Sequence, residues 1–297
     1  MSTGAVRVLI TGVNGQVGGA FAPAAAADGF IVLRASRDDL DLAKSATIKP
    51  FLDRNQPDIV VNCAAYTAVD QAEKEPDLAF AINAEAPGVL AEWCAEHDRS
   101  LLHISTDYVF PGDASRPYRE EDPTGPSSVY GASKLEGERK VREACPRHVI
   151  FRTAWVYAAE GKNFVRTMLR LGAERDLLSV VADQRGCPTS ADSIAQALCS
   201  GLRTLGRDDV AAIAGTYHYV DRGETTWHGF AERIFAGAEA RWGRRPTVQP
   251  ITTDQYPTPA KRPSYSVLDT AKFQSVFGRV PPAWQDSLDA VLAQIFS

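Results

Sequence analysis

The chain has 297 residues, of which 44% are hydrophobic and 23% charged, and its formal net charge is -5. This length predicts one large domain with a smaller appended lobe, and the composition is ordinary for a globular protein. The slightly acidic balance gives no reason to expect a nucleic-acid partner, although local basic residues can still bind an anionic small molecule.

Short apolar runs alternate with helix-length segments over the first two thirds of the chain, a pattern typical of β-α-β units in a parallel sheet. The early runs are almost continuously apolar, as in strands covered by helices on both faces. We predict an α/β fold, with a Rossmann-type doubly wound parallel sheet and a smaller, interleaved C-terminal substrate lobe. The expected strands are Arg7 to Ile10, Phe30 to Leu33, Asp58 to Asn62, Leu101 to Ser105, Val149 to Arg152, Leu178 to Val181 and Thr216 to Val220.

A glycine loop follows the first expected strand directly and has the spacing GxxGxxG. Glycines let the backbone turn tightly and approach a pyrophosphate, whose charge then lies at the N-terminus of the next helix among free N–H groups. A tight turn without a ligand is the alternative, but the position after the first strand favours dinucleotide binding. The expected cofactor-binding residues of this loop are Gly12, Asn14, Gly15, Gln16, Val17 and Gly18.

The end of the second expected strand should decide the choice of cofactor. A carboxylate there would bind the adenosine ribose of NAD, but this chain has arginines at Arg34 and Arg37. The forked arginine cation suits a 2′-phosphate, so NADPH is favoured and NADH remains possible. If no phosphate binds, both arginines are solvated surface charges. Asp41 and Leu42 are expected to flank the adenine.

The segment from Glu75 to His97 predicts a long helix with Pro76 near its start. Pro87 and Gly88 in its middle should bend or divide it.

The clearest chemical pattern is a YxxxK pair, Tyr130 and Lys134, together with Thr106 at the end of an earlier strand. A spacing of four places the pair on one face of a helix. A phenol with its ordinary pKa of ~10 is a poor acid at neutral pH, and we expect the lysine cation to lower that pKa. YxxxK alone is common on helix surfaces, but next to a dinucleotide loop it indicates catalysis.

Reduction of a ketone needs a hydride on carbon and a proton on oxygen, and a nicotinamide supplies only the hydride. We expect Tyr130 to donate the proton, and the Thr106 hydroxyl to donate a hydrogen bond to the same carbonyl oxygen. Lys134 should also hold the nicotinamide ribose. All three residues are therefore predicted to lie at the carboxyl ends of the strands, where doubly wound sheets bind their ligands.

After Thr153 the alternation loosens, and a proline-rich stretch from Pro246 to Pro263 precedes a final amphipathic helix from Trp284 to Phe296. We predict that the proline-rich stretch is an ordered loop on the substrate side. The expected division is a nucleotide-binding domain over 1–153, completed by about 176–220, with a substrate-binding lobe over 154–175 and 221–297.

Five scattered cysteines with no CxxC pair suggest neither a disulfide framework nor a zinc site, and a reducing cytoplasm fits them best. The N-terminus enters the glycine loop without a secretory signal pattern. No apolar run approaches the ~20 residues that span a membrane. We therefore expect a cytoplasmic protein without a membrane partner.

With their flanks, these motifs resemble the extended short-chain dehydrogenase/reductase family, and within it the reductases of dTDP-linked 4-keto-6-deoxyhexoses. The resembling segments span nearly the whole chain: Val61 to Asp70, Ser105 to Phe110, Arg152 to Tyr157, Asp183 to Thr189, Gly215 to Tyr219 and Tyr256 to Pro263.

The resemblance implies NAD(P)H-dependent reduction of dTDP-4-dehydro-β-L-rhamnose to dTDP-β-L-rhamnose, the last step in making that nucleotide sugar. It implies that the cofactor is lined by Ala65, Tyr66 and Thr67, and that the substrate is contacted by Thr67, Val69, Thr106, Asp107 and Trp155.

Two of the expected substrate residues also have physical support. A buried tryptophan with adjacent arginines suits a nucleotide base and a diphosphate, so Trp155 is expected beside the substrate and Arg262 at the diphosphate. The alternatives are core packing for Trp155 and a structural salt bridge for Arg262.

Some members of the resembling family are magnesium-linked dimers that use a glutamate early in the first helix. This chain has Gly18-Gly19-Ala20-Phe21 there and no acid before Asp28, so we expect no metal site of that kind. The chain is expected to be a monomer or a homodimer.

Two other functions stay open. The first is another nucleotide-sugar epimerase, dehydratase or 4-ketoreductase of the extended family, and Asp107 would suit the acid of a dehydratase. The second is a non-catalytic regulatory subunit of the same fold. Against that second reading, Thr106, Tyr130 and Lys134 are all present.

Overall fold

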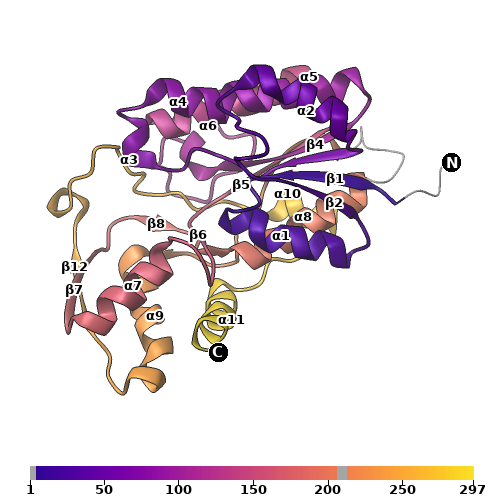
Figure 1. The fold of residues 1–297 in the computed structure, drawn as a ribbon. Coiled ribbons are helices and arrows are strands. Elements are labelled where there is room, and N and C mark those ends of the chain that lie inside the picture. Colours follow the sequence, from indigo (N-terminus) through magenta and orange to yellow (C-terminus); the bar gives the residue numbers. More distant parts are fainter. Residues whose placement is uncertain (1–4, 206–212) are drawn as a thin grey trace.

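The computed structural model describes residues 5–205 and 213–297, and its centre is a parallel six-stranded sheet in the order β10-β5-β4-β3-β1-β2 (Figure 1). Its strands are β1 (Arg7–Thr11), β2 (Ile31–Ala35), β3 (Ile59–Asn62), β4 (Ser100–Thr106), β5 (His148–Thr153) and β10 (Gly215–His218). This confirms the predicted doubly wound α/β fold. Because β1 pairs with β2 on one side and β3 on the other, the loops after β1 and β3 diverge at a topological switch point.

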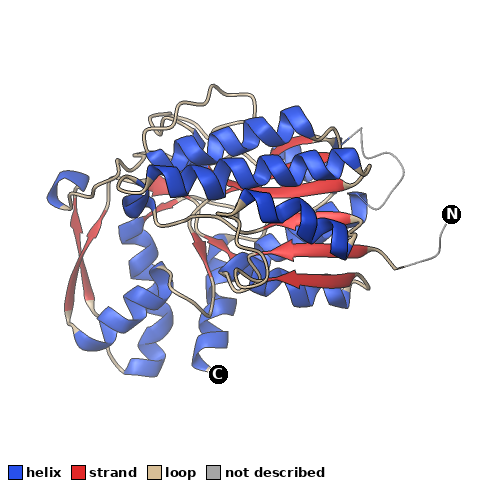
Figure 2. Cartoon of the chain, turned by 45° about the horizontal axis from the view of Figure 1, so that its top comes forward, coloured by secondary structure: helices blue, strands red, loops and turns tan. Residues whose placement is uncertain are grey.

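Helices cover both faces of this sheet (Figure 2). One face carries α1 (Gln16–Ala27), α8 (Ala191–Leu205) and α10 (Ala271–Phe277). The other carries α2 (Ile48–Asn55), α5 (Ala86–Glu96) and α6 (Val129–Ala144), with the short helices α3 (Val69–Ala72) and α4 (Pro76–Phe80) beside α6. Both faces are thus buried, which explains why the strands read as continuous apolar runs.

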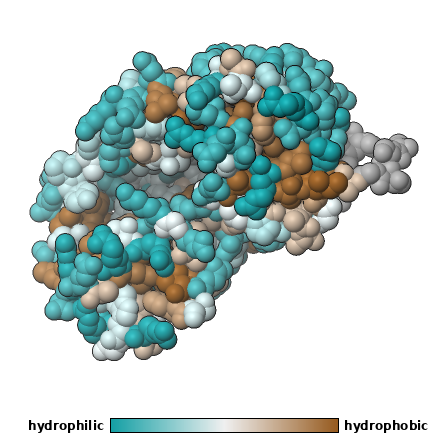
Figure 3. All heavy atoms as spheres, viewed as in Figure 1, coloured by the Kyte–Doolittle hydropathy of each residue, from teal (hydrophilic) through white to brown (hydrophobic). Residues whose placement is uncertain are grey.

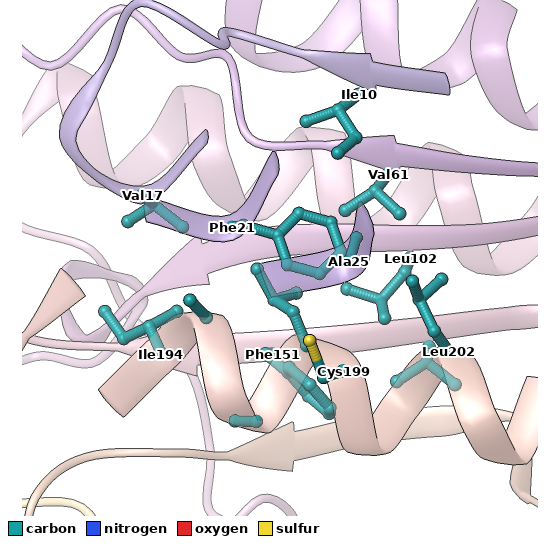
Figure 4. Close-up of a cluster of buried hydrophobic side chains, with 14 of the residues drawn as sticks. Ile10, Val17, Phe21, Ala25, Val61, Leu102, Phe151, Ile194, Cys199 and Leu202 are labelled. Atoms are coloured by element: carbon teal, nitrogen blue, oxygen red, sulfur yellow. The ribbon is translucent and has the colours of Figure 1, made fainter. Parts of the chain in front are cut away.

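Successive strand residues supply two separate hydrophobic clusters. Ile10, Val61, Leu102 and Phe151 point from four strands toward Phe21 of α1 and toward α8 (Figure 4). Their chain neighbours Leu9, Val60, Leu101 and Ile150 face α2, α5 and α6 on the opposite side. Full burial of each large apolar side chain contributes about 1.5–3 kcal/mol, so both layers are held firmly to the sheet.

The predicted helix from Glu75 to His97 is divided by a π-helical turn at Ala81–Glu85, between α4 and α5. Pro87 has no N–H to donate to the carbonyl of Asn83, four residues earlier. That carbonyl instead lies against Gly137 of α6, where any Cβ would collide with it. The helix is thus interrupted next to Pro87, as predicted, and the π-helical turn packs against α6.

A C-terminal lobe packs below the sheet and consists of α7 (Phe164–Glu174), β7 (Leu177–Val181), α9 (Trp227–Trp242), β12 (Thr247–Ile251) and α11 (Trp284–Phe296) (Figure 1). Four two-residue strands complete its connections to the sheet: β6 (Val156–Tyr157) pairs with β9 (Thr189–Ser190), and β8 (Arg185–Gly186) pairs with β11 (Thr225–Thr226). The final helix begins and ends where the sequence predicts.

One expected strand lies elsewhere. Leu178 to Val181 was placed with the nucleotide-binding domain, but β7 pairs with β12 in a separate two-stranded sheet. Its residues alternate between exposed and buried, because helices of the lobe cover it on one face. β10 does join the central sheet beside β5, while 206–212 lie outside the described residues.

In the described part, no helix is long and apolar enough to cross a membrane.

Candidate active site

A cavity of about 820 Å³ opens at the carboxyl ends of β1, β3, β4 and β5, between the central sheet and the C-terminal lobe. On the face drawn in Figure 3, the surface is hollowed between these two parts of the molecule. The volume is in the range of ligand-binding clefts. Most of the expected site residues line this cavity together: Gly12, Asn14, Gly15, Gln16, Val17, Arg37, Asp41, Leu42, Ala65, Tyr66, Thr67, Val69, Thr106, Asp107, Tyr130, Lys134 and Trp155.

The glycine loop forms one wall of the cavity and opens α1. Gly12 has φ +68°, and a Cβ there would lie 2.7 Å from the backbone N of Ala64. The first N–H groups of α1 have no partner within the helix, and its first turn carries no acid. This cradle fits a pyrophosphate, and a side chain at position 12 would collide with the loop after β3 that forms the neighbouring wall. Gly18 does not line the cavity, and it packs against the Gly12 carbonyl, where a Cβ would collide.

The loop after β2 closes the end of the cavity where the sequence led us to expect the adenosine of a dinucleotide. Arg37 lines the cavity, with its side chain 77% exposed and 3.8 Å from Asp41. The weak, solvated pairing leaves the Arg37 guanidinium available to a phosphate. Arg34 does not line the cavity, because it lies in edge strand β2 with its side chain exposed. Of the two arginines expected to choose the cofactor, the structure therefore brings only one to the site.

Asn83, in the π-helical turn, holds the loop after β3 in place. Its side-chain oxygen accepts from the N–H of Tyr66 at 2.8 Å, and its amide nitrogen donates to the Tyr66 carbonyl at 3.1 Å. The same nitrogen donates to Ser133 at 3.0 Å. One buried asparagine thus connects a cavity-lining loop to α6. We did not predict this role, although an asparagine four residues before Pro87 was visible in the sequence.

Thr106 and Asp107 end β4 at the centre of the cavity. The Thr106 hydroxyl donates to Asp107 Oδ1 at 2.9 Å and accepts from the N–H of Tyr108 at 3.3 Å. Burial raises the pKa of Asp107 to about 6, although hydrogen bonds from Ser266 and Thr106 oppose the shift. A buried carboxyl with such a pKa is typical of functional sites.

Tyr130 and Lys134 lie in the first two turns of α6 and are both buried. The helix starts there because Ser128 caps it, accepting from the N–H of Gly131 at 3.1 Å, and Glu73 accepts from the N–H of Val129 at 2.9 Å. Lys134 Nζ donates to the Ile104 carbonyl at 2.6 Å. The cap thus fixes the helix end that carries the pair.

The expected lowering of the Tyr130 pKa is not what the structure shows. Burial raises the pKa of Tyr130 above 10, and the hydrogen bond with Thr106 lowers it only in part. Burial likewise lowers the pKa of Lys134 to about 8, against the attraction of Glu138 and Cys63. Removal from water penalises both charged forms, which sequence spacing alone does not reveal. Tyr130 is thus protonated at neutral pH, as a proton donor must be.

Trp155 lines the cavity at the start of the lobe, in a left-handed conformation with φ +47°. Its ring stacks on Trp227, with centroids 3.5 Å apart and planes within 6°. The ring also lies close to Gly186, where a Cβ would collide with it. One face of Trp155 is therefore occupied by protein.

Arg262, expected at the diphosphate, does not line the cavity. Its guanidinium donates to Asp70 Oδ2 at 2.7 Å, and the other Asp70 oxygen accepts from the N–H of Ala260 at 3.1 Å. The structural salt bridge, which was the alternative, is what the structure shows, because a partly buried arginine is stabilised by a carboxylate partner.

Several cavity residues were missed by sequence reasoning. Lys162 is an exposed cation without an ion pair among the residues described, and the Thr153 hydroxyl is buried there without a hydrogen-bond partner in the described chain. Ser36 and Trp227 also line the cavity. In the sequence, Lys162 is only a lysine in a loop, and Ser36 and Thr153 are only hydroxyl residues at strand ends. Over 5–205 and 213–297, no group of three His, Cys, Asp or Glu residues could hold a metal ion.

Three comparisons extend these observations. A family model described as the RmlD substrate binding domain matches residues 6–296. A dTDP-4-dehydrorhamnose reductase of Sinorhizobium fredii is 45% identical over 282 residues, which cover 95% of each chain. The crystal structure of a dTDP-4-dehydrorhamnose reductase from Clostridium acetobutylicum is 37% identical, with a TM-score of 0.92 and coverage of 98% of this chain and 100% of that one. A Bacillus anthracis dTDP-4-dehydrorhamnose reductase solved with NADP is 35% identical, with a TM-score of 0.90 and coverage of 98% and 99%.

Proposed function

Because the chain belongs to the RmlD substrate binding domain family, we propose that it reduces dTDP-4-dehydro-β-L-rhamnose to dTDP-β-L-rhamnose with NAD(P)H. The observation that carries this proposal is the single cavity shared by the glycine loop, Thr106, Tyr130 and Lys134. Its relatives of similar length carry the name of this activity, and one was solved with NADP.

The chain's own groups account for the proton side of the reaction. A nicotinamide held by the glycine loop and Lys134 would supply the hydride to the carbonyl carbon. Tyr130, which burial holds in its neutral form, donates its proton to the oxygen as negative charge develops there. The Thr106 hydroxyl, which donates to Asp107 in the structure, turns to donate a hydrogen bond to the same oxygen and so stabilises that charge. Lys134 Nζ holds the nicotinamide ribose and so fixes the reacting groups.

The substrate is held at the lobe side of the cavity in this proposal. Thr67 and Val69 would contact the hexose from the loop after β3, and Asp107 from the end of β4. Trp155 would present its free face or edge to the substrate, backed by Trp227. Lys162 replaces Arg262 as the cation that we assign to a phosphate in this cavity.

The direct test is turnover by the purified protein supplied with dTDP-4-dehydrorhamnose and NADPH. We expect oxidation of NADPH and a product whose C4 configuration, determined by NMR, is that of L-rhamnose. Another C4 configuration would assign a different 4-ketoreductase. Turnover of dTDP-glucose with NAD would identify a dehydratase, and no turnover of either substrate would favour a regulatory subunit.

We further propose that NADPH is preferred to NADH, because Arg37 and Ser36 lie at the adenosine end of the cavity. Arg37→Ala should raise KM for NADPH by about tenfold with little change for NADH, the lower end of the effect expected for a hydrogen bond to a charged group. Steady-state kinetics with both cofactors measure this. Arg34→Ala is the matched control, since Arg34 lies outside the cavity. A wild-type preference for NADH would contradict the proposal.

Three further properties belong to the proposal. All five cysteines are free, which supports a reducing compartment such as the cytoplasm. The first turn of α1 carries no acid, which supports an enzyme that needs no magnesium there, whether it is a monomer or a homodimer. We assign nucleotide binding mainly to residues 1–153 and substrate binding mainly to 154–175 and 221–297.

A further inference from the structure

A chain of buried polar side chains runs across three neighbouring strands beneath the cavity. Thr11 of β1, Asn62 of β3 and His103 of β4 are adjacent in the sheet register and are each at most 2% exposed. The Thr11 hydroxyl donates to Asn62 at 2.6 Å, and the Asn62 amide lies 3.0 Å from His103 Nδ1. Buried polar groups cost free energy unless they are paired, so a continuous chain here calls for an explanation.

Both ends of this chain reach residues that line the cavity. At one end, Thr11 accepts from the N–H of Ala64 at 3.3 Å, next to the glycine loop. At the other end, His103 Nε2 lies 3.4 Å from Lys134 Nζ. The mechanism proposed above uses Lys134 but assigns nothing to Asn62 or His103.

The partners of Lys134 restrict its ammonium group. An ammonium has three N–H donors. One donates to the Ile104 carbonyl at 2.6 Å, and a second faces His103 Nε2. When Nε2 accepts, two donors are held from below and the third is left for a ligand in the cavity that Lys134 lines. Without His103, the Lys134 ammonium would keep only one fixed contact and could turn.

His103 is suited to this role because it stays neutral. Burial and the nearby Lys134 charge lower the pKa of His103 well below its usual value. A neutral ring carries one proton. In the structure the Asn62 oxygen accepts from Thr11 and the Asn62 nitrogen faces His103 Nδ1. When Lys134 is charged and donates to Nε2, the ring proton lies on Nδ1, and the Asn62 amide must turn over so that its oxygen accepts that proton. When Lys134 is uncharged, Nε2 carries the proton and the amide presents its nitrogen. Because an amide can exchange the places of its oxygen and nitrogen, Asn62 can pair with either tautomer of the His103 ring.

We propose that His103 is a positioning residue, which acts through the buried chain of Thr11 and Asn62 to hold Lys134 Nζ toward the cofactor. This inference rests on the role proposed above for Lys134. The groups that face Lys134 are Glu138 on its own helix, Cys63 after β3 and His103 on β4.

His103→Leu tests the proposal, because it removes the acceptor and leaves an apolar side chain. We expect kcat/KM for NADPH to fall about tenfold. The alkaline limb of the pH profile of kcat/KM should also move to lower pH. Loss of the acceptor disfavours the charged form of Lys134 and so lowers its pKa, and the enzyme loses activity as pH rises through that pKa. His103→Gln, whose amide can accept from Lys134, should keep most of the wild-type kcat/KM and most of the wild-type pH profile. If the leucine variant does not fold, His103→Asn takes its place, since the shorter amide reaches Asn62 but not Lys134.

His148→Leu is the matched control. His148 is buried in β5, where it pairs in register with Leu101 of β4, but it bonds to the Cys145 carbonyl at 2.6 Å and does not line the cavity. It should lower stability without moving kcat/KM or the pH profile. Equal kinetic losses in both leucine variants, or an unchanged pH profile in His103→Leu, would overturn the inference. Lys134→Met distinguishes the proposed role of Lys134 from that of His103. Full activity of Lys134→Met refutes the role of Lys134 itself. An inactive Lys134→Met together with wild-type kinetics of His103→Leu refutes only the positioning role of His103.

Discussion

Tyr130→Phe is expected to lower turnover of the 4-keto sugar by about 10²- to 10⁴-fold, the usual contribution of a positioned proton donor. Tyr130 is only 9% exposed, and the variant keeps its ring, which packs edge-on against Tyr108 with centroids 5.5 Å apart, and loses only the hydroxyl. Binding of NADPH, measured in the absence of the sugar, should therefore change little. Single-turnover rates and the Kd for NADPH together measure the prediction.

Tyr217→Phe is the control for this variant. The Tyr217 hydroxyl donates to the Ile213 carbonyl at 2.8 Å, on the far edge of the sheet and outside the cavity. It should leave turnover unchanged. Wild-type turnover in Tyr130→Phe would remove Tyr130 as the proton donor. Because burial raises the Tyr130 pKa above 10, the wild-type protein should also show no activity loss from ionisation of this residue below about pH 10.

Glu138→Ala is expected to lower the free energy of unfolding by about 3–5 kcal/mol, because it leaves the buried Arg152 cation without its partner. Glu138 lies one turn after Lys134 and is fully buried. Arg152 donates to its two oxygens at 2.8 and 2.7 Å and is itself only 3% exposed. Urea unfolding at neutral pH measures the loss. Glu136→Ala, which removes a largely solvated pair with Arg139, should cost less than about 1 kcal/mol.

The Glu138 carboxylate should also affect how the free energy of unfolding falls at acidic pH. Burial raises the pKa of Glu138, but the hydrogen bonds and charge of Arg152, together with the hydrogen bond from Arg142, outweigh it and leave the pKa below its usual 4.5. A carboxyl whose pKa is lower in the folded state stabilises the protein above about pH 4.5, and that contribution is lost as pH falls through the folded pKa. Unfolding of Glu138→Ala should therefore depend less on pH in that range. An equal acid limb in both proteins would contradict this assignment.

The central sheet could be predicted because its strands are buried on both faces. Residues such as Leu9 and Ile10 enter different hydrophobic clusters, so the whole run must be apolar, and such runs are conspicuous in a sequence. β7 was misplaced because an apolar run shows only that a strand is buried, and its partner β12 lies some 70 residues further along the chain. Pairing between strands so far apart depends on packing, which local pattern does not contain.

The site divides in the same way. The glycine loop, Tyr130 and Lys134 could be predicted because phosphate binding and the tyrosine–lysine pair each require a fixed spacing in the sequence. The pKa of Tyr130 could not, since it depends on burial that only the folded chain creates. The ion pair of Arg262 could not be predicted either, because its partner Asp70 lies 192 residues away. His103 was passed over, because a histidine in an apolar strand gives no sign of the side chain that its ring will face.

The position of β10 has a consequence for the order in which the protein is made. β5 ends at Thr153, but its neighbour in the sheet, β10, is not synthesised until residue 218. Phe151 of β5 also packs against Phe273 and Phe277 of α10, which come later still. A ribosome that has translated the glycine loop and both Tyr130 and Lys134 therefore carries a sheet with one open hydrophobic edge, and such an edge can pair with other chains. The catalytic residues are thus complete well before β10 covers the edge of β5, and before α10 covers the face that carries Phe151.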